Sequence, residues 1–176
     1  MPALEVYQRS MAFLHYAFGT AAADGLTMDQ LHFTPPGDSH SVAWTIWHAT
    51  RGEDWAIQET LLQVPTEWEA GGWAARTKLP AEGVGLGMTA EETRQIRLDD
   101  LATFQGYAAA VAARTNAYLD RLTEGELERP ITVLGRDETV GLCLALHLVN
   151  HLNAHRGEVN LIRGMLGAPP IVLPPA

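Results

Sequence analysis

Residues 138–166 read ETVGLCLALHLVNHLNAHRGEVNLIRGML, and this stretch decides the fold. It predicts one long helix, which Gly167 and the proline pair at 169–170 bring to an end. The first half of this helix, residues 140–149, is apolar nearly all the way round except for His147. A helix with apolar side chains on every face is buried, so we expect this half to lie in the centre of the domain.

Three further long helices are predicted upstream, each bounded by residues that start or stop helices. They cover residues 3–23, the stretch from Ser39 or Ser41 to about Val64, and residues 89–122 with a break near Leu98 and Asp99. A short helical turn at residues 27–31 lies between the first two. Four long helices in a chain of this length predict an all-α fold, a four-helix bundle.

The segment between the second and third helices, residues 65–88, differs in composition from the rest of the chain. It combines two prolines and several glycines with Trp68 and Trp73. We interpret it as a long ordered loop that the two tryptophans hold against the domain, and such loops are usually functional. A second connection covers residues 126–137, and its residues 131–133 are expected to be briefly extended.

Length, charge and cysteine content limit the classes of protein that fit this sequence. Because the chain has 176 residues, we expect one domain spanning residues 1–176. The net charge of −9 and the scattered Lys and Arg argue against a protein that coats nucleic acid or an anionic membrane. No apolar run is long enough to cross a bilayer, and the N-terminus lacks a signal-peptide pattern. The only cysteine, Cys143, excludes an internal disulfide, and these features together predict a cytoplasmic protein.

Three histidines of the last helix, His147, His151 and His155, are spaced four residues apart and fall on one stripe. Neighbours at this spacing have Cβ atoms roughly 5–6 Å apart, so two imidazoles can meet at one metal ion. His147 and His155 cannot share an ion, because eight residues of helix rise about 12 Å. The spacing therefore allows either the 147/151 pair or the 151/155 pair.

A metal site needs at least one further ligand, and His48 is the best candidate. It lies in the second predicted helix near Trp44, Trp47 and Trp55, where a polar ring needs a partner. A lone histidine in a core is more often hydrogen-bonded than metal-bound, whereas a buried i,i+4 pair is more specific. Three other histidines are weaker candidates: His15 on the first helix, and His32 and His40 near loop boundaries.

Several other chemistries do not fit the residues. Leu152 follows His151, whereas the zinc-protease pattern requires Glu directly after the first histidine. No histidine has a Glu three residues before it, as di-iron bundles require. The sequence also contains no Walker loop and no nucleophile-elbow serine, and the alternating glycines at 83–87 do not connect a strand to a helix.

Several stretches of the sequence resemble the DinB-like superfamily. The run from His147 to Glu158, HLVNHLNAHRGE, is similar to the family's last-helix pattern His-x-x-Asn-His-x-x-x-His-Arg-Gly-Gln, with Glu158 in place of Gln. The second helix also matches, with SVAWTIWH over residues 41–48 and EDW over 53–55. The stretch from Gly72 through Glu92 matches as well. The resemblance covers nearly the whole chain, from Tyr7 to Gly167.

The resemblance implies an up-down-down-up four-helix bundle with a three-histidine site for zinc, nickel or a similar ion. Carried over position by position, the ligands are His48, His151 and His155, which selects the 151/155 pair. Relatives include thiol-dependent enzymes that use mycothiol, bacillithiol or glutathione, such as S-transferases and maleylpyruvate isomerase, and some are dimers. The implied partners are a low-molecular-weight thiol, a small-molecule electrophile and, for a homodimer, a second copy of the chain. Nucleic acid and membrane are not among them.

Three imidazoles leave a coordination position open, where a bound thiol becomes a nucleophile at neutral pH. We therefore expect a metal-dependent thiol S-transferase, and the alternative is a bundle with a structural metal or a small-molecule binding module. Arg51 and Arg156 are candidate anion-binding groups, although surface ion pairs are the more common role of Arg. Glu158 is expected either to support His155 or to lie on a solvated face. The loop at 66–88 is expected to shape the pocket.

Overall fold

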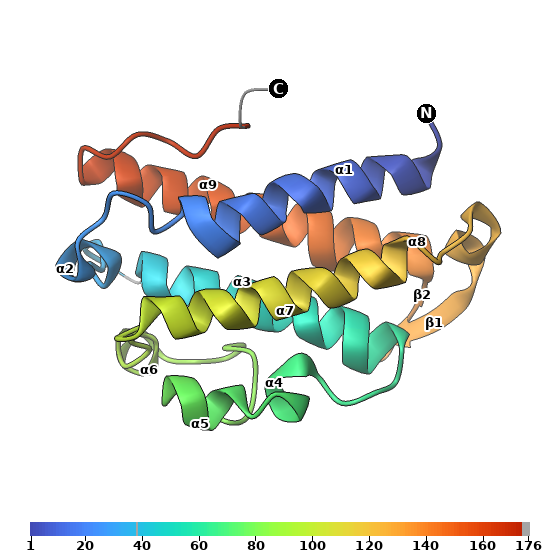
Figure 1. The fold of residues 1–176 in the computed structure, drawn as a ribbon, viewed down its shortest axis with the longest axis horizontal. Coiled ribbons are helices and arrows are strands. Elements are labelled where there is room, and N and C mark those ends of the chain that lie inside the picture. Colours follow the sequence, from blue (N-terminus) through green and yellow to red (C-terminus); the bar gives the residue numbers. More distant parts are fainter. Residues whose placement is uncertain (38, 174–176) are drawn as a thin grey trace.

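The computed structural model describes residues 1–37 and 39–173, and it is mostly helical, as predicted. Its long helical segments lie side by side along the longest axis of the molecule (Figure 1). Each of three segments joins α-helix to a π-helical turn. In chain order, the segments are α1 (Ala3–Tyr16) with η1 (Ala17–Ala21), α3 (Val42–Asp54) with η2 (Trp55–Leu61), α7 (Leu101–Leu119), and α8 (Val140–Cys143) with η4 (Leu144–Asn150) and α9 (His151–Met165).

Shorter elements connect these segments. Two of them, α4 and α5, lie within residues 65–88, and a two-stranded antiparallel sheet precedes α8. The short elements are α2 (Met28–Leu31), α4 (Glu67–Ala70), α5 (Trp73–Thr77), α6 (Ala90–Arg94), the 3-10 helix η3 (Glu124–Glu128), β1 (Pro130–Val133) and β2 (Arg136–Thr139).

The start of the second long segment is settled in favour of Ser41. The Ser41 hydroxyl accepts a hydrogen bond from the Trp44 amide at 3.1 Å, so it satisfies one of the free amides at the helix N-terminus. The segment ends at Leu61, three residues before the predicted end at Val64. The predicted break in the third region is also present, because α6 ends at Arg94 and α7 begins at Leu101.

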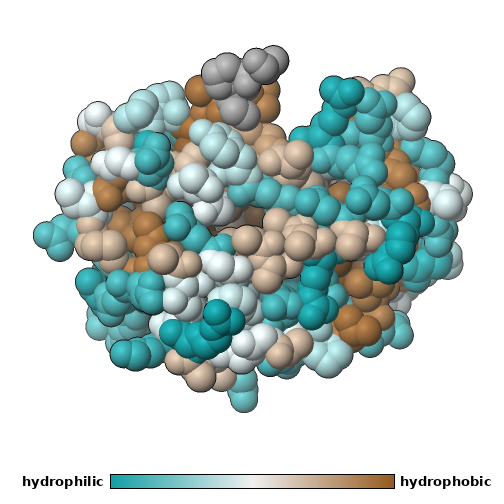
Figure 2. Space-filling model, in the orientation of Figure 1, coloured by the Kyte–Doolittle hydropathy of each residue, from teal (hydrophilic) through white to brown (hydrophobic). Residues whose placement is uncertain are grey.

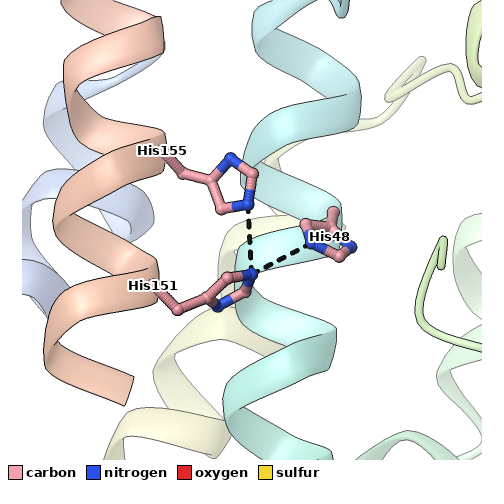
Figure 3. A group of neighbouring side chains, drawn as sticks. All are labelled: His48, His151 and His155. Atoms are coloured by element: carbon pink, nitrogen blue, oxygen red, sulfur yellow. Dashed lines mark hydrogen bonds between the residues drawn. The ribbon is translucent and has the colours of Figure 1, made fainter. Parts of the chain in front are cut away.

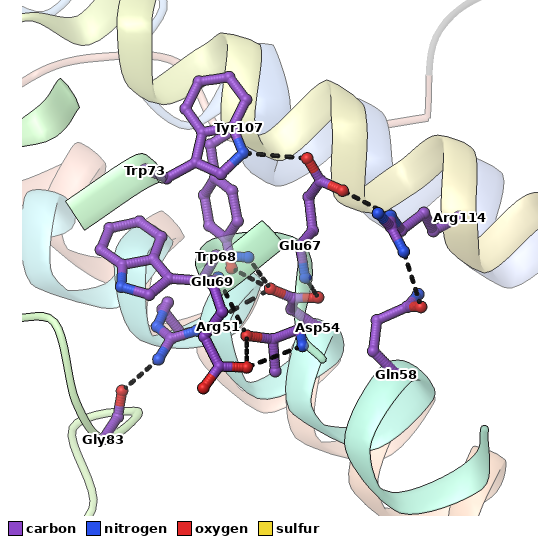
Figure 4. Close-up of polar contacts among 11 residues, drawn as sticks. Arg51, Asp54, Gln58, Glu67, Trp68, Glu69, Trp73, Gly83, Tyr107 and Arg114 are labelled. Carbon is purple, nitrogen blue, oxygen red and sulfur yellow. Dashed lines mark hydrogen bonds and ion pairs between the residues drawn. The ribbon is translucent and has the colours of Figure 1, made fainter. Parts of the chain in front are cut away.

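The segment 65–88 contains more regular structure than the predicted loop. Thr66 and Glu69 form a capping box that starts α4. The carboxylate of Asp54 on α3 accepts hydrogen bonds from the amides of Glu67 and Trp68, at 2.8 and 2.9 Å (Figure 4). The buried Trp68 and Trp73 pack this segment onto the helices, as the sequence predicted.

The predicted short extended stretch at 131–133 is one strand of a hairpin. Its partner strand β2 is mostly polar, and the register pairs Val133 with Arg136. The turn between them consists of Leu134 and Gly135, both with positive φ. Neither β2 nor the turn has the sequence pattern that predicts a hairpin, which is usually Asn-Gly or Asp-Gly between alternating apolar residues.

The core is formed where the long segments pack on one another. α1 contacts α7 and η4, and α3 contacts both α7 and α9. The first half of the last segment is only partly central, because Leu142 and Leu146 are exposed. The prediction that this half is buried all round was therefore wrong. Hydrophilic residues and small separate hydrophobic patches are mixed on the face shown in Figure 2. Within the described chain, no helix combines the length and apolar character needed to span a membrane.

Candidate metal centre

The packing of α3 on α9 brings His48, His151 and His155 together (Figure 3). The Nε2 atom of His151 lies 3.1 Å from the Nε2 atoms of both other rings. All three can contribute a nitrogen to one group in which the ligand atoms lie within 4.8 Å of one another. His147, by contrast, is outside this group. The three residues named from the sequence therefore meet at one point in the structure.

The orientation of His48 is set by the segment 83–85. The Nδ1 atom of His48 donates a hydrogen bond to the carbonyl oxygen of Val84, which leaves the Nε2 lone pair facing the other two histidines. The ring also stacks on Trp44, with ring centroids 4.6 Å apart. Only 5% of His48 is exposed. This ring is therefore held in one tautomer and one direction.

The orientation of His155 is set by Glu158, one turn later on the same helix. The Nδ1 atom of His155 lies 2.7 Å from a carboxylate oxygen of Glu158 and donates to it. The Nε2 atom of His155 therefore also presents a lone pair to the centre of the group. Glu158 stands where the resembling pattern has Gln, and its carboxylate accepts this hydrogen bond. Of the two roles expected for Glu158, the structure favours support of His155.

The chemistry of the three facing nitrogens fits a metal ion. With their Nδ1 protons committed to Val84 and Glu158, His48 and His155 each direct a bare Nε2 toward His151. The Nε2 of His151 carries at most one hydrogen, so it can donate to only one of them. At least one lone pair in this partly buried group therefore faces no donor, and a transition-metal cation would satisfy all three.

Burial keeps the central imidazoles neutral. It lowers the pKa of His48 to about 4, with the neighbouring His155 and His40 acting in the same direction. Burial likewise lowers the pKa of His151 to about 4, reinforced by the positive charge that nearby histidines would carry. Because only neutral imidazole binds a metal, both rings are in the ligand form at pH 7.

The remaining histidines have other partners. The Nε2 atom of His147 lies 3.2 Å from both carboxylate oxygens of Glu138, and that of His15 lies 2.8 Å from Glu53. His32 accepts from the amide of Leu98 and donates to a backbone carbonyl. His40 stacks on Trp44, with centroids 3.8 Å apart. His15, His32, His40 and His147 are therefore not part of the group formed by His48, His151 and His155.

Arg51 does not lie at the surface, where the more common role of Arg had placed it; its ion pair, with Asp54 at 3.8 Å, is buried. Arg51 is buried, its guanidinium lies over Trp68, and its Nη2 donates to the carbonyl oxygen of Gly83 at 2.8 Å (Figure 4). It thus holds the carbonyl adjacent to the one that orients His48. Arg156 lies away from the group, where it contacts the ring of Phe13.

A cavity of about 360 Å³ lies beside the histidines, and Val84 and Leu86 of the segment 66–88, which was expected to shape the pocket, are part of its walls. His48 and His151 form part of its lining, together with Trp55 and Val84. Three leucines from separate segments complete the apolar wall: Leu86, Leu134 and Leu146. No sequence pattern groups Leu134 of the hairpin turn and Leu146 of η4 with Leu86, because these residues are far apart in the chain.

The sequence model of the DinB superfamily matches residues 20–159. The chain belongs to the DinB superfamily. A crystal structure described as a conserved protein from Enterococcus faecalis has a similar fold, with a TM-score of 0.81. Its sequence is 23% identical, and the alignment covers 95% of this chain and 99% of that one. Among curated proteins, none matches this DinB-superfamily chain significantly.

Proposed function

We propose that this protein binds one divalent transition-metal ion, zinc or nickel, through His48, His151 and His155. We further propose that it is an enzyme in which a low-molecular-weight thiol attacks a small electrophile. One observation carries the proposal: three Nε2 atoms converge, and the Nδ1 protons of the two outer rings are bound by Val84 and Glu158. This is the arrangement of orienting hydrogen bonds that accompanies metal-bound imidazoles.

Each part of the site has a distinct role in this proposal. When bound, the ion supplies a positive charge that lowers the pKa of a thiol at its open position. The carbonyl of Val84 and the carboxylate of Glu158 keep the ligand nitrogens aimed at the ion. Arg51 holds the neighbouring carbonyl of Gly83, so it stabilises the backbone that orients His48. The adjacent cavity provides room for a small molecule beside the ligand nitrogens.

The second candidate function is a helical bundle with a structural metal or a binding module without turnover. A closed structural site uses four protein ligands, whereas a catalytic site keeps one position open. Among the described residues, the group contains His48, His151 and His155 and no fourth His, Cys, Asp or Glu. This open position, together with the adjacent cavity, favours the enzyme.

The finer features of the fold belong to the same proposal. We assign the long segments to an up-down-down-up four-helix bundle. In Figure 1, α3 and α7 run in one direction, and α1 and α9 both run in the opposite direction, which supports this assignment. One cluster of buried residues, from Met11 to Ile171, supports a single domain over the described part of residues 1–176. A cytoplasmic location and a homodimer remain proposals taken from the sequence and the resemblance.

Metal analysis of purified protein, followed by a screen of thiols, tests the proposed function. We expect one ion per chain in the wild type and in His147→Ala, and loss of the ion in His48→Ala, His151→Ala and His155→Ala. Mycothiol, bacillithiol and glutathione would then each be mixed with monochlorobimane, with and without a chelator. Metal-dependent conjugation with one thiol supports the enzyme. Stoichiometric metal without conjugation by any thiol supports the structural alternative.

A further inference from the structure

The tip of the β hairpin contains a residue that suits neither the turn nor solvent. Leu134 has a φ of 49° and Gly135 a φ of 76°, and together they form the two-residue turn between β1 and β2. Such turns prefer Asn-Gly or Asp-Gly, because a branched side chain is strained at positive φ. Leu134 is also 65% exposed. Neither the turn nor the core therefore accounts for a leucine at this position.

The side chain of Leu134 lines the cavity beside the histidines. Leu86 and Leu146 line it as well, and they are 73% and 44% exposed. Single exposed apolar residues are common, but three from different segments line this hollow next to His48 and His151. Leu86 and Leu134 also form the edge that it shares with a second cavity, lined by Arg51 and three glutamates. Convergent apolar walls with few polar groups are typical of a small-molecule site.

The lining also indicates the charge of the molecule that fits. Asn150 and His147 are its polar members beyond the metal-site histidines, and His147 is held by Glu138. No Asp, Glu, Lys or Arg is among the described residues that line this cavity. Transfer of a charged group into such surroundings is unfavourable unless a partner neutralises it. The volume of about 360 Å³ lies at the lower end of the range for small-molecule sites.

We propose that this cavity binds a small, uncharged, mainly apolar molecule, and that Leu134 occupies the hairpin turn because it contacts that molecule. The molecule is the electrophilic substrate, a role that rests on the proposed function. Its binding to the apolar walls does not depend on the metal ion. Leu134 is then a specificity-determining residue whose contact with the ligand offsets its poor fit to the turn.

The substitution Leu134→Asn tests this inference, because it improves the turn and removes the apolar contact. Calorimetric titration of metal-free protein would use 2-naphthol, which is neutral at pH 7, and 2-naphthoate, which has the same ring system and a charge. We expect the wild type to bind 2-naphthol more tightly than 2-naphthoate. Leu134→Asn should raise the melting temperature and weaken 2-naphthol binding about fivefold to tenfold. Leu161→Asn, at an exposed leucine of α9 that does not line this cavity, is the matched control.

Leu134→Gly is a second variant that suits the turn. It is needed because the Asn side chain of the first variant can itself form a hydrogen bond with the probe. Unchanged 2-naphthol affinity in both variants would overturn the inference, as would equal binding of 2-naphthoate to the metal-free wild type. Naphthol binding that depends on Leu134 in a protein without stoichiometric metal would support the cavity while contradicting the metal site. Stoichiometric metal without naphthol binding would support the metal site and contradict the proposed role of the cavity.

Discussion

The contact between Gly85 and the metal-site histidine provides a sharp test of how the site is built. A Cβ atom at position 85 would lie 3.1 Å from His48 Nδ1, 3.0 Å from Trp47 Cζ3 and 3.2 Å from Trp44 Cζ2. All three neighbours belong to the buried helix α3, so none of them can move freely. Gly85 also has a φ of 95°, which side chains rarely adopt.

Gly85→Ala should therefore have two effects, one on folding stability and one on metal affinity. The strained backbone alone costs roughly 1–3 kcal/mol of folding stability. The added methyl group also pushes the 83–85 backbone away from His48 and weakens the hydrogen bond from His48 Nδ1 to Val84. Loss of an orienting hydrogen bond of this kind reduces metal affinity about 10- to 100-fold. Urea unfolding measures the first effect, and competition with a chromophoric chelator measures the second.

Gly87→Ala is the matched control for this substitution. Gly87 also has a positive φ, of 77°, but a Cβ atom there would meet nothing within 4 Å. Both variants should lose stability, and only Gly85→Ala should lose metal affinity by more than tenfold. Equal metal affinity in the two variants would refute the claim that the 83–85 segment orients His48.

Three further predictions concern the hydrogen bonds and charges of the site. Glu158→Gln keeps an acceptor for His155 and should change metal affinity less than tenfold, whereas Glu158→Ala should lower it about 10- to 100-fold in the same chelator competition. Because the pKa of His48 and of His151 is about 4 in the folded protein and about 6.5 unfolded, the unfolded chain binds protons first as pH falls. The free energy of unfolding of metal-free protein should thus fall by up to about 3 kcal/mol for each ring between pH 6.5 and pH 4. A free energy of unfolding in urea that stays constant over this range would contradict the prediction. Asp54→Ala removes the acceptor of three donors, two of them buried, and should lower the free energy of unfolding measured in urea by about 3–5 kcal/mol. Asp54→Asn should cost less, because its amide oxygen still accepts. A loss below 1 kcal/mol would contradict that role.

The parts of this protein that sequence could predict are those coded by neighbouring residues. Helix periodicity and capping residues such as Ser41 predicted the long segments, because both depend on residues within a few positions of each other. Spacing on the last helix limited the metal pair to two choices by the same local geometry. The resemblance, not the spacing, selected the pair that the structure places with His48.

The parts that could not be predicted depend on contacts between distant segments. His48 bonds to Val84, which is 36 residues away, and no local pattern indicates that pairing. The hairpin was missed because Leu134 replaces the usual turn residue. Arg51 was expected at the surface because Arg is usually exposed, but the Asp54 carboxylate, Trp68 and the Gly83 carbonyl provide partners that allow its burial.

The nitrogen ligation of a bound ion is the most direct test of the account. X-ray absorption at the zinc edge of protein loaded with one equivalent of zinc should give three imidazole nitrogens at about 2.0–2.1 Å and one exchangeable oxygen ligand from water. His151→Ala, which removes the central ring of the group, should abolish that spectrum. A coordination shell that includes sulfur from Cys143, or one unchanged in His151→Ala, would contradict the three-histidine site.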